Sequence, residues 1–296
     1  MSDDIRIALL GLDTSHAIAF AGLLHDEGLS VSRRVKGMRV SMCYREDSAF
    51  RTDGEQDQAQ ARLEGWGIRV TRSLDEALGG CDAVMLLAND PARHLPLFRE
   101  IAGTGKPVFI DKPLAASLAE GSEIVAIASA KGMRFFSASA LRFLPDVARV
   151  AAIRPVPRHL EVAGPIHEPP AGSGVFWYGV HTVEMLHRVM GFSRARLHAT
   201  RDQMGILAEI DYADGRHGVI RLNRNDADYG LVIIDRGVPE VVPVDITDIY
   251  LPLMRVVADF FRGGAAPVKP ADSLEILTIL QAIDTSLACH EKVDLA

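Results

Sequence analysis

Two side chains, one in each half of the sequence, have the chemistry to handle a proton. The first is Lys112, in Asp111-Lys112-Pro113, directly after an apolar run that ends at Ile110. The adjacent acid and a proline that stiffens the turn would let this ammonium hydrogen-bond a hydroxyl or carbonyl oxygen, and partial burial would lower its pKa toward the working range. A solvent-exposed loop lysine is the alternative, and only the position after a strand favours the functional interpretation.

The second side chain is His181. The spacing of Trp177, His181, Glu184 and Arg188 predicts that they share one face of a helix over residues 176–189. Histidine is suited to proton transfer near neutral pH, and a carboxylate one turn away could orient the ring or raise its pKa. A core histidine with a purely structural role is the alternative that the sequence leaves open.

A turn with one glycine follows the first apolar strand, in Gly11-Leu12-Asp13-Thr14-Ser15-His16. A dinucleotide-binding fingerprint would have glycine at positions 11, 13 and 16, and only Gly11 matches. The second glycine lets the backbone approach a pyrophosphate, and here it is replaced by Asp13. Asp13 could instead cap the following helix and place its own carboxylate at the anion site of the helix N-terminus.

The end of the second strand is also unusual. A Rossmann domain that prefers NAD places an acid there for the ribose hydroxyls, whereas this chain has Tyr44-Arg45. Arg45 could accept a 2′-phosphate or stack on adenine. An ordinary exposed arginine fits the sequence equally well.

The elements that must position these residues alternate between short apolar strands and helices in the first half. Strands are predicted over 5–10, 38–44, 68–71, 82–87, 107–110 and 134–137, and helices up to 24 and over 56–65, 91–102 and 118–130. This order predicts a Rossmann-type doubly wound parallel sheet that binds ligands at the carboxyl ends of its strands.

The pattern changes after about residue 142. A helix over 145–153 leads to a strand over 158–164 and to the helix that carries His181; strands over 195–200, 204–212, 217–223 and 230–235 follow, and helices over 250–261 and 273–288 close the chain. Short turns between successive strands predict an α+β domain on a largely antiparallel sheet. We therefore divide the chain into domains 1–142 and 143–296.

Composition narrows the class of protein. The 296 residues are 48% hydrophobic and 24% charged, with a formal net charge of −7, so nothing directs the chain toward nucleic acid or anionic lipid. The polar start gives no sign of a signal peptide, and no uncharged run is long enough to cross a bilayer. Cys43, Cys81 and Cys289 are scattered without metal-ligand spacing and are interpreted as small buried hydrophobic residues in a reducing compartment, so a cytoplasmic location is expected.

Five motifs together resemble the glucose–fructose oxidoreductase and inositol dehydrogenase (Gfo/Idh/MocA) family, almost from end to end. They are Asp111-Lys112-Pro113 for the family's Glu-Lys-Pro, Asn89-Asp90-Pro91-Ala92-Arg93-His94 for its Pro-Asn-x-x-His loop, Arg142-Phe143, Gly179-Val180-His181-Thr182-Val183-Glu184 for Gly-x-His-x-x-Asp, and the tail over 274–295. The chain departs from the family at Asp13, where a glycine is usual, and at Trp177, where an aspartate is frequent.

The resemblance implies an NAD(P)-dependent oxidoreductase that acts on a sugar, polyol or related carbohydrate-like hydroxy compound in a cleft between its domains. Lys112 would orient the substrate oxygen and His181 would be the general base. The implied cofactor site, for NADP or NAD bound weakly because of Asp13, consists of Gly11, Asp13, Thr14, Ser15, His16, Tyr44, Arg45, Ala88, Asn89, His94, Asp111 and Lys112.

The resemblance also implies a homo-oligomer that packs sheet to sheet. In the second domain Ile206, Ala208 and Ile210 alternate with Leu207, Glu209 and Asp211, and outward apolar residues such as Val232 and Ile234 would stay exposed in a monomer.

Two other functions remain open at this point. The first is a non-catalytic or regulatory small-molecule-binding protein on a retired Rossmann scaffold, with Asp13 filling the phosphate site. The second is a metal-assisted lyase or hydrolase that uses Asp13, His16, His94 and His181, although these residues lack a metal-ligand spacing.

Overall fold

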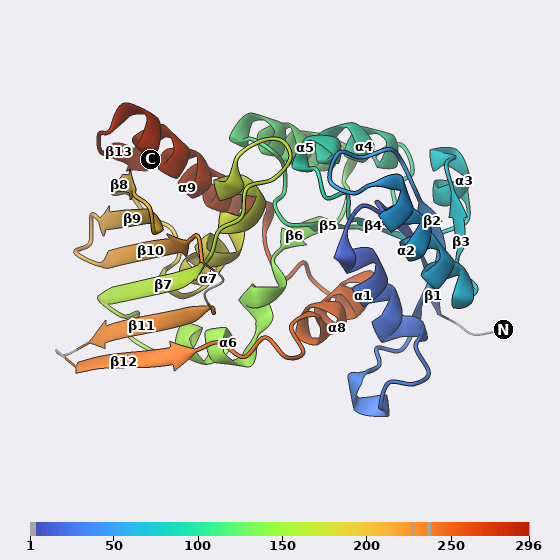
Figure 1. Ribbon diagram of the computed structural model, residues 1–296, viewed down its shortest axis with the longest axis horizontal. Helices are drawn as coiled ribbons and strands as arrows, with labels where there is room; N and C mark the ends of the chain where they lie inside the picture. The colour runs from blue at the N-terminus through green and yellow to red at the C-terminus, as the bar shows by residue number, and fades with distance from the viewer. Residues whose placement is uncertain (1–3, 226–227, 236–237, 296) are drawn as a thin grey trace. The chain divides into compact units, whose positions relative to one another are not determined.

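The computed structural model describes residues 4–225, 228–235 and 238–295 and forms two compact units (Figure 1). Unit 1 contains Met1–Ser137 and Tyr250–Pro270, and unit 2 contains Ala138–Ile249 and Ala271–Ala296. The predicted boundary at 142/143 therefore lies five residues too late, and the division misses the return of residues 250–270 to unit 1. Residues 1–3 of the polar start lie outside the described residues.

Unit 1 is built on a sheet with the strand order β3-β2-β1-β4-β5-β6. These strands are β1 (Ile5–Leu10), β2 (Met38–Tyr44), β3 (Arg69–Thr71), β4 (Ala83–Leu86), β5 (Val108–Asp111) and β6 (Phe135–Ala138). The pairings from β3 through β5 are parallel, and the order reverses between β1 and β4. This reversal is the switch point at which doubly wound sheets bind ligands, so the predicted fold class is confirmed for this unit.

Helices cover both faces of this sheet. They are α1 (Ser15–His25), α2 (Asp53–Gly65), α3 (Leu74–Gly79), α4 (His94–Ile101), α5 (Leu118–Lys131) and α8 (Tyr250–Phe261), with short 3₁₀ turns η1 (Val31–Arg33) and η2 (Pro91–Arg93). Figure 1 shows α4 and α5 on one face and α1 and α8 on the other. The six-residue α3 was not predicted, because one and a half turns carry too little periodicity.

The return of α8 to unit 1 has a packing cause. The ring of Tyr250 contacts the rings of His16 and Phe20, and Phe260 packs edge-on against Phe136 at a centroid distance of 5.0 Å. Apolar periodicity predicted the helix itself correctly, but periodicity does not state which sheet will bury the apolar face.

Unit 2 is built on a mixed sheet with the order β12-β11-β7-β10-β9-β8-β13. The strands are β7 (His159–Pro165), β8 (Ala195–Arg201), β9 (Gly205–Tyr212), β10 (His217–Asn223), β11 (Gly230–Asp235), β12 (Val238–Pro243) and β13 (Val293–Leu295). β7 and β10 pair in parallel, and the other described pairings are antiparallel, which confirms a largely antiparallel sheet. The sequence did not predict β12, because its two prolines argue against a strand; they are tolerated here since β12 is an edge.

The helices of unit 2 include the one that bears His181. They are η3 (Ala140–Phe143), α6 (Pro145–Ala151), the π-helical turn η4 (Val175–Gly179), α7 (Val180–Met190) and α9 (Pro270–Cys289). α7 packs on β7 and β10. On β9, Ile206, Ala208 and Ile210 are buried, as their alternation predicted. No helix within the described part of the chain is long and apolar enough to cross a membrane.

Candidate nucleotide-binding and proton-transfer residues

Gly11 is required by the backbone geometry after β1. Its φ is 118°, and a Cβ built on it would lie 2.5 Å from the backbone nitrogen of Ala88. Its own N–H donates to the carbonyl oxygen of Tyr44 at 3.1 Å. The loops after β1, β2 and β4 therefore meet at this residue. Only glycine accepts this φ and this close approach of the neighbouring backbone.

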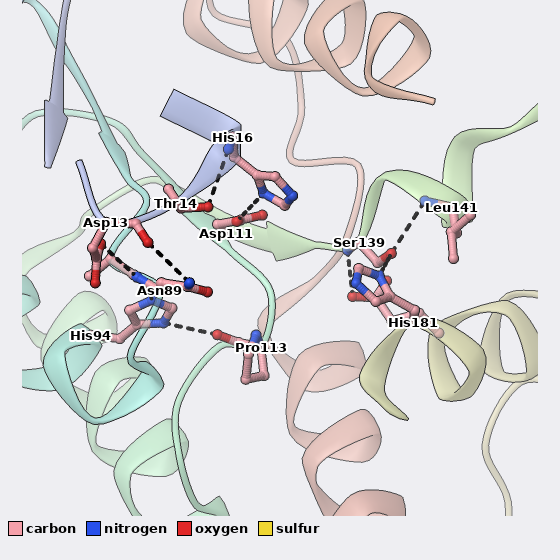
Figure 2. A network of polar contacts seen from close by, with 12 residues as sticks. Asp13, Thr14, His16, Asn89, His94, Asp111, Pro113, Ser139, Leu141 and His181 are labelled. Carbon is pink, nitrogen blue, oxygen red and sulfur yellow. Dashed lines mark hydrogen bonds and ion pairs between the residues drawn. The ribbon is translucent and has the colours of Figure 1, made fainter. Parts of the chain in front are cut away.

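Asp13 is buried beside Gly11 and connects two of these loops (Figure 2). The Ser48 hydroxyl donates to Asp13 Oδ2 at 2.6 Å, and the backbone N–H of Asn89 donates to Oδ1 at 3.1 Å. The Asn89 side-chain amide in turn donates to the carbonyl oxygen of Asp13 at 3.1 Å. The carboxylate therefore lies in a polar network at the carboxyl ends of the strands.

The prediction that Asp13 caps α1 is wrong. The N-cap residue is Thr14, whose φ and ψ of −128° and 151° are extended and whose hydroxyl accepts the N–H of His16 at 3.2 Å. The cap has moved one residue along because Asp13 is held by Ser48 and Asn89. Ser15 is exposed and lines a groove of about 780 Å³ between α1 and α2, outside this polar network.

The side chains of His16 and Asp111 are hydrogen-bonded at the end of β5. The distance between His16 Nδ1 and Asp111 Oδ2 is 2.5 Å. Burial alone would raise the pKa of Asp111, but the charge and hydrogen bond of His16, together with the charge of Lys112, hold it below its ordinary value. Asp111 is thus kept as a carboxylate next to Lys112.

Lys112 is partly buried, as the functional interpretation required. Burial lowers the pKa of its ammonium below the ordinary value of 10.5, and the neighbouring Asp111 carboxylate opposes this shift. A lysine with a lowered pKa can exchange a proton closer to neutral pH than an exposed one.

His94 is a structural residue rather than a ligand-binding one. Its ring is fully buried, and Nδ1 lies 2.9 Å from the carbonyl oxygen of Pro113 (Figure 2) and Nε2 lies 2.9 Å from that of Ala88. The ring thereby connects the loop of Lys112 to the loop after β4. Because both nitrogens face carbonyl oxygens, the ring offers neither nitrogen to the cofactor for which the sequence predicted it, nor to the metal of the alternative function.

Arg45 is neither the exposed residue nor the phosphate-binding residue that the sequence offered as alternatives. It is buried, and its guanidinium donates to Asp57 at 2.6 Å and to Gln60 at 3.0 Å, both on α2. The helix α2 follows this strand closely in the sequence, and its side chains accept the hydrogen bonds of the Arg45 guanidinium. Burial raises the pKa of the neighbouring Tyr44, and Arg93 and Arg72 act on the Tyr44 hydroxyl in the opposite sense.

His181 lies in unit 2, directly after the π-helical turn η4. Such turns are rare and are found frequently at functional sites. His181 Nδ1 lies 2.7 Å from the hydroxyl oxygen of Ser139, a buried residue between β6 and η3 (Figure 2). The rings of Tyr178 and Tyr229 stand edge-on to the imidazole, with centroids at 5.1 and 6.2 Å.

The predicted common face of the helix is not regular. The π turn shifts Trp177 out of α-helical register with His181, and Arg188 is exposed whereas Glu184 is buried. Glu184 Oε1 accepts the backbone N–H of Ser139 at 2.7 Å. Glu184 Oε2 lies 3.7 Å from the guanidinium of Arg142, the arginine of the Arg-Phe motif.

The three histidines of the metal-assisted interpretation each have at least one ring nitrogen in contact with a protein group. His16 is paired with Asp111, His94 faces carbonyl oxygens, and His181 Nδ1 contacts Ser139. A group whose ligand atoms lie within 4.8 Å of one another is formed instead by His187, Asp272 and Glu275. Arg142 lies 3.4 Å from His187 Nδ1, and this cation disfavours a further positive charge there.

Sequence reasoning missed Ser48 and Ser139. Each contacts its partner across 35 and 42 residues of chain, respectively, and a single serine in a loop has no spacing signal. Several residues predicted for the site in unit 1 do contact one another. Gly11 contacts Tyr44, Asp13 contacts Asn89, His16 contacts Asp111, and His94 contacts Ala88.

These observations define a class: a protein with a Rossmann-type unit and a second unit that presents a histidine from a helix on a mixed sheet. The Gfo/Idh/MocA family model, described as "Oxidoreductase family, NAD-binding Rossmann fold", matches residues 42–139. The chain is also 33% identical over 89 residues to a Salmonella typhimurium (strain LT2) protein named "Putative oxidoreductase YceM", in a match that spans 30% of this chain and 29% of that protein. The predicted resemblance to the family is therefore confirmed.

Solved structures extend the likeness of fold over both units. The structure of GenD2 from gentamicin A biosynthesis, in complex with NAD, has a TM-score of 0.80 at 18% identity and covers 100% of this chain and 97% of its own. Myo-inositol 2-dehydrogenase from Lactobacillus plantarum has a TM-score of 0.81 at 14% identity, with 99% and 100% covered. The family model and the curated relative are both named as oxidoreductases, in agreement with the predicted class of enzyme, and they do not favour the binding-protein alternative.

Proposed function

We propose that this protein is an NAD(P)-dependent oxidoreductase that transfers hydride between a nicotinamide cofactor and a hydroxyl-bearing, carbohydrate-like small molecule. The observation that carries the proposal is Lys112, partly buried and lowered in pKa at the carboxyl end of β5, beside the His16–Asp111 pair. The NAD-binding description of the matching family model, the NAD complex of GenD2 and the name of the myo-inositol 2-dehydrogenase support the same chemistry.

The residues of unit 1 fit a dinucleotide, although at reduced affinity. Gly11 leaves its backbone without a side chain beside Ala88, and the N-terminus of the 11-residue α1 follows within four residues, as an anion site requires. The carboxylate of Asp13 opposes a pyrophosphate, but it is held by Ser48 and Asn89 rather than by the amides of α1. The engagement of Arg45 with α2 removes the basis for a preference for NADP over NAD.

When bound, the nicotinamide supplies the acceptor or donor of hydride. The protein must then bind the substrate oxygen and take up or return the proton of its hydroxyl group, and we assign these two tasks to Lys112 and His181. The family resemblance gives the oxygen to Lys112 and the proton to His181. Oxidation in this sense converts the substrate alcohol to a carbonyl, with its carbon-bound hydrogen leaving as hydride and its hydroxyl hydrogen as a proton.

Titration of the purified protein with NADH and with NADPH, followed by nicotinamide fluorescence, tests the proposal most directly. We expect saturable but weak binding of at least one of them. If neither NADH nor NADPH binds up to millimolar concentration, the redox function is contradicted, and a binding protein on a retired Rossmann scaffold is favoured.

His181 can be tested separately. We expect His181→Ala to lower kcat by about two orders of magnitude, as loss of a positioned proton-handling group does, with the Kd for cofactor nearly unchanged. A histidine with a purely structural role would instead lower the melting temperature with little specific effect on rate. Steady-state kinetics and a thermal melt of the same preparation distinguish the two outcomes.

We also propose a cytoplasmic homo-oligomer that pairs through the open face of the unit 2 sheet. Val232 and Ile234 lie on the face opposite the buried Leu231 and Ile233, and Val241, which pairs with Val232, is 71% exposed. The three cysteines are free, in keeping with a reducing compartment. We expect Val241→Glu to shift the mass measured by light scattering from oligomer to monomer; a monomeric wild type at micromolar concentration contradicts the assembly.

A further inference from the structure

The contact between Ser139 and His181 determines more than the position of the ring. Ser139 is fully buried and is held by three contacts with residues of unit 2, one at its backbone nitrogen and two at its hydroxyl oxygen. Its backbone N–H donates to Glu184 Oε1 at 2.7 Å, its hydroxyl oxygen accepts the N–H of Leu141 at 3.2 Å, and the same oxygen lies 2.7 Å from His181 Nδ1. His181 and Glu184 are one turn apart on α7, so a single helix turn holds both ends of this serine.

The hydrogen-bond inventory then decides the direction of the serine–histidine contact. A serine hydroxyl has one proton to donate, and a buried donor without an acceptor is costly. The oxygen of Ser139 already accepts from Leu141, and His181 Nδ1 is the acceptor within reach of its proton. If Nδ1 carried a proton instead, the serine oxygen would accept twice and its own proton would face the fully buried surroundings of residue 139.

We infer that Ser139 donates to Nδ1 and thereby holds neutral His181 as the Nε2–H tautomer, so that His181 binds the substrate oxygen as a hydrogen-bond donor and Lys112 is the base. This inference rests on the proposed oxidoreductase function and exchanges the two roles that the resemblance implies. Ser139 is then a positioning residue, and Glu184 acts on the imidazole through the backbone of Ser139.

The proton and electron balance follows from this assignment. In oxidation, the hydroxyl proton of the substrate would move to the neutral Lys112 amine and its carbon-bound hydrogen would leave as hydride, for which a bound nicotinamide would supply the acceptor, so that the alcohol becomes a carbonyl. His181 Nε2–H would donate a hydrogen bond to the substrate and would change no covalent bond of its own. A neutral imidazole that polarises a substrate oxygen in this way needs a fixed tautomer, which the buried serine supplies.

The restraint on the ring comes from aromatic neighbours as well. Tyr178 and Tyr229 stand edge-on to the imidazole at interplanar angles of 77° and 74°, and Tyr229 is buried. A ring flip would exchange Nδ1 with a carbon atom and break the contact to Ser139. The tyrosines therefore retain the geometry that the hydroxyl defines.

Nitrogen-15 NMR of the full chain, labelled at histidine, tests the tautomer without any requirement for activity. We expect the His181 signals, assigned by their loss in His181→Gln, to show a protonated Nε2 and an unprotonated Nδ1 near neutral pH. In Ser139→Ala the signals should move toward a mixture of tautomers, whereas in Ser137→Ala, a buried serine on the adjoining strand, they should not move. A protonated Nδ1 in the wild type would overturn the inference.

Kinetics give the second readout. We expect Ser139→Ala to lower kcat about tenfold, with an unchanged KM for cofactor, the size expected for one hydrogen bond that acts through His181. His181→Gln keeps an N–H donor and should retain more activity than His181→Leu; equal loss in both would overturn the donor role. If no turnover is found with any hydroxy compound, the proposed function fails while the NMR experiment still decides the tautomer.

Discussion

Replacing Lys112 by methionine should lower kcat by about two orders of magnitude or more while the fold persists. Methionine keeps an unbranched chain of similar length and removes the amine. The loss is expected for either role of Lys112, because the group that holds the substrate oxygen and the group that takes its proton are both needed in the transition state. Circular dichroism and a thermal melt should show a folded protein, since burial lowers the pKa of this ammonium and its charged form is therefore disfavoured in the folded state.

The pH dependence of the wild type provides a second check on Lys112. A base must be neutral to accept a proton, so the rate of oxidation should rise with pH as Lys112 loses its proton. Because burial lowers the pKa of Lys112, the rate should increase at a pH below 10.5. The residual activity of Lys112→Met should not show this increase. Lys131→Met, a change of the same kind at an exposed lysine at the end of α5, should leave rate and profile unchanged. Full activity in Lys112→Met would rule out both roles.

Replacing Asp13 by asparagine should tighten the binding of the dinucleotide by about one to three decades. A carboxylate about 4 Å from a pyrophosphate opposes it by roughly 1 kcal/mol in water-like surroundings and by about 4 kcal/mol at the effective dielectric of a partly buried site, and about 1.4 kcal/mol corresponds to one decade. Asparagine keeps an oxygen for the N–H of Asn89 and offers its amide to the Ser48 hydroxyl, so the network persists without the charge.

Two further variants separate charge from structure at this position. Asp13→Gly restores the usual glycine and should also tighten binding, but at a cost in melting temperature because the bonds to Ser48 and Asn89 are lost. Asp47→Asn removes an exposed carboxylate in the loop after β2 and should change neither quantity beyond a few tenths of a decade. If the wild type binds at micromolar concentration and Asp13→Asn binds no better, the carboxylate does not oppose the phosphates.

The strands and helices of unit 1 were predictable because each carries its own signal. β1 and β2 were predicted at their observed bounds, and β4 and β5 to within one residue at each end, since buried parallel strands are continuous apolar runs between helices. α8 was predicted at its observed bounds for the same kind of reason, an apolar face with helical period. The unit to which α8 belongs was not predictable, because the sheet that buries its apolar face can come from any part of the chain.

The candidate site was predictable only where a motif fixed its place. Gly11 and Lys112 follow strands directly, so their position at the carboxyl edge of the sheet followed from the topology. The environments of Asp13, Arg45 and His94 did not, because each depends on side chains that the fold supplies: Ser48 and Asn89 for the first, α2 for the second, and backbone carbonyls for the third.

The sequence by itself determined the order of strands and helices, the Rossmann class of the first unit, and the residues whose chemistry suits proton transfer, since apolar period and strand-end motifs are local properties of the chain. The tertiary structure decided the return of α8 to unit 1, the capping of α1 by Thr14, and the contact of Ser139 with His181. These depend on distances between residues remote in sequence. Hydrogen bonds and burial act through such distances, so only the folded chain can show which acid, hydroxyl or carbonyl each catalytic candidate meets.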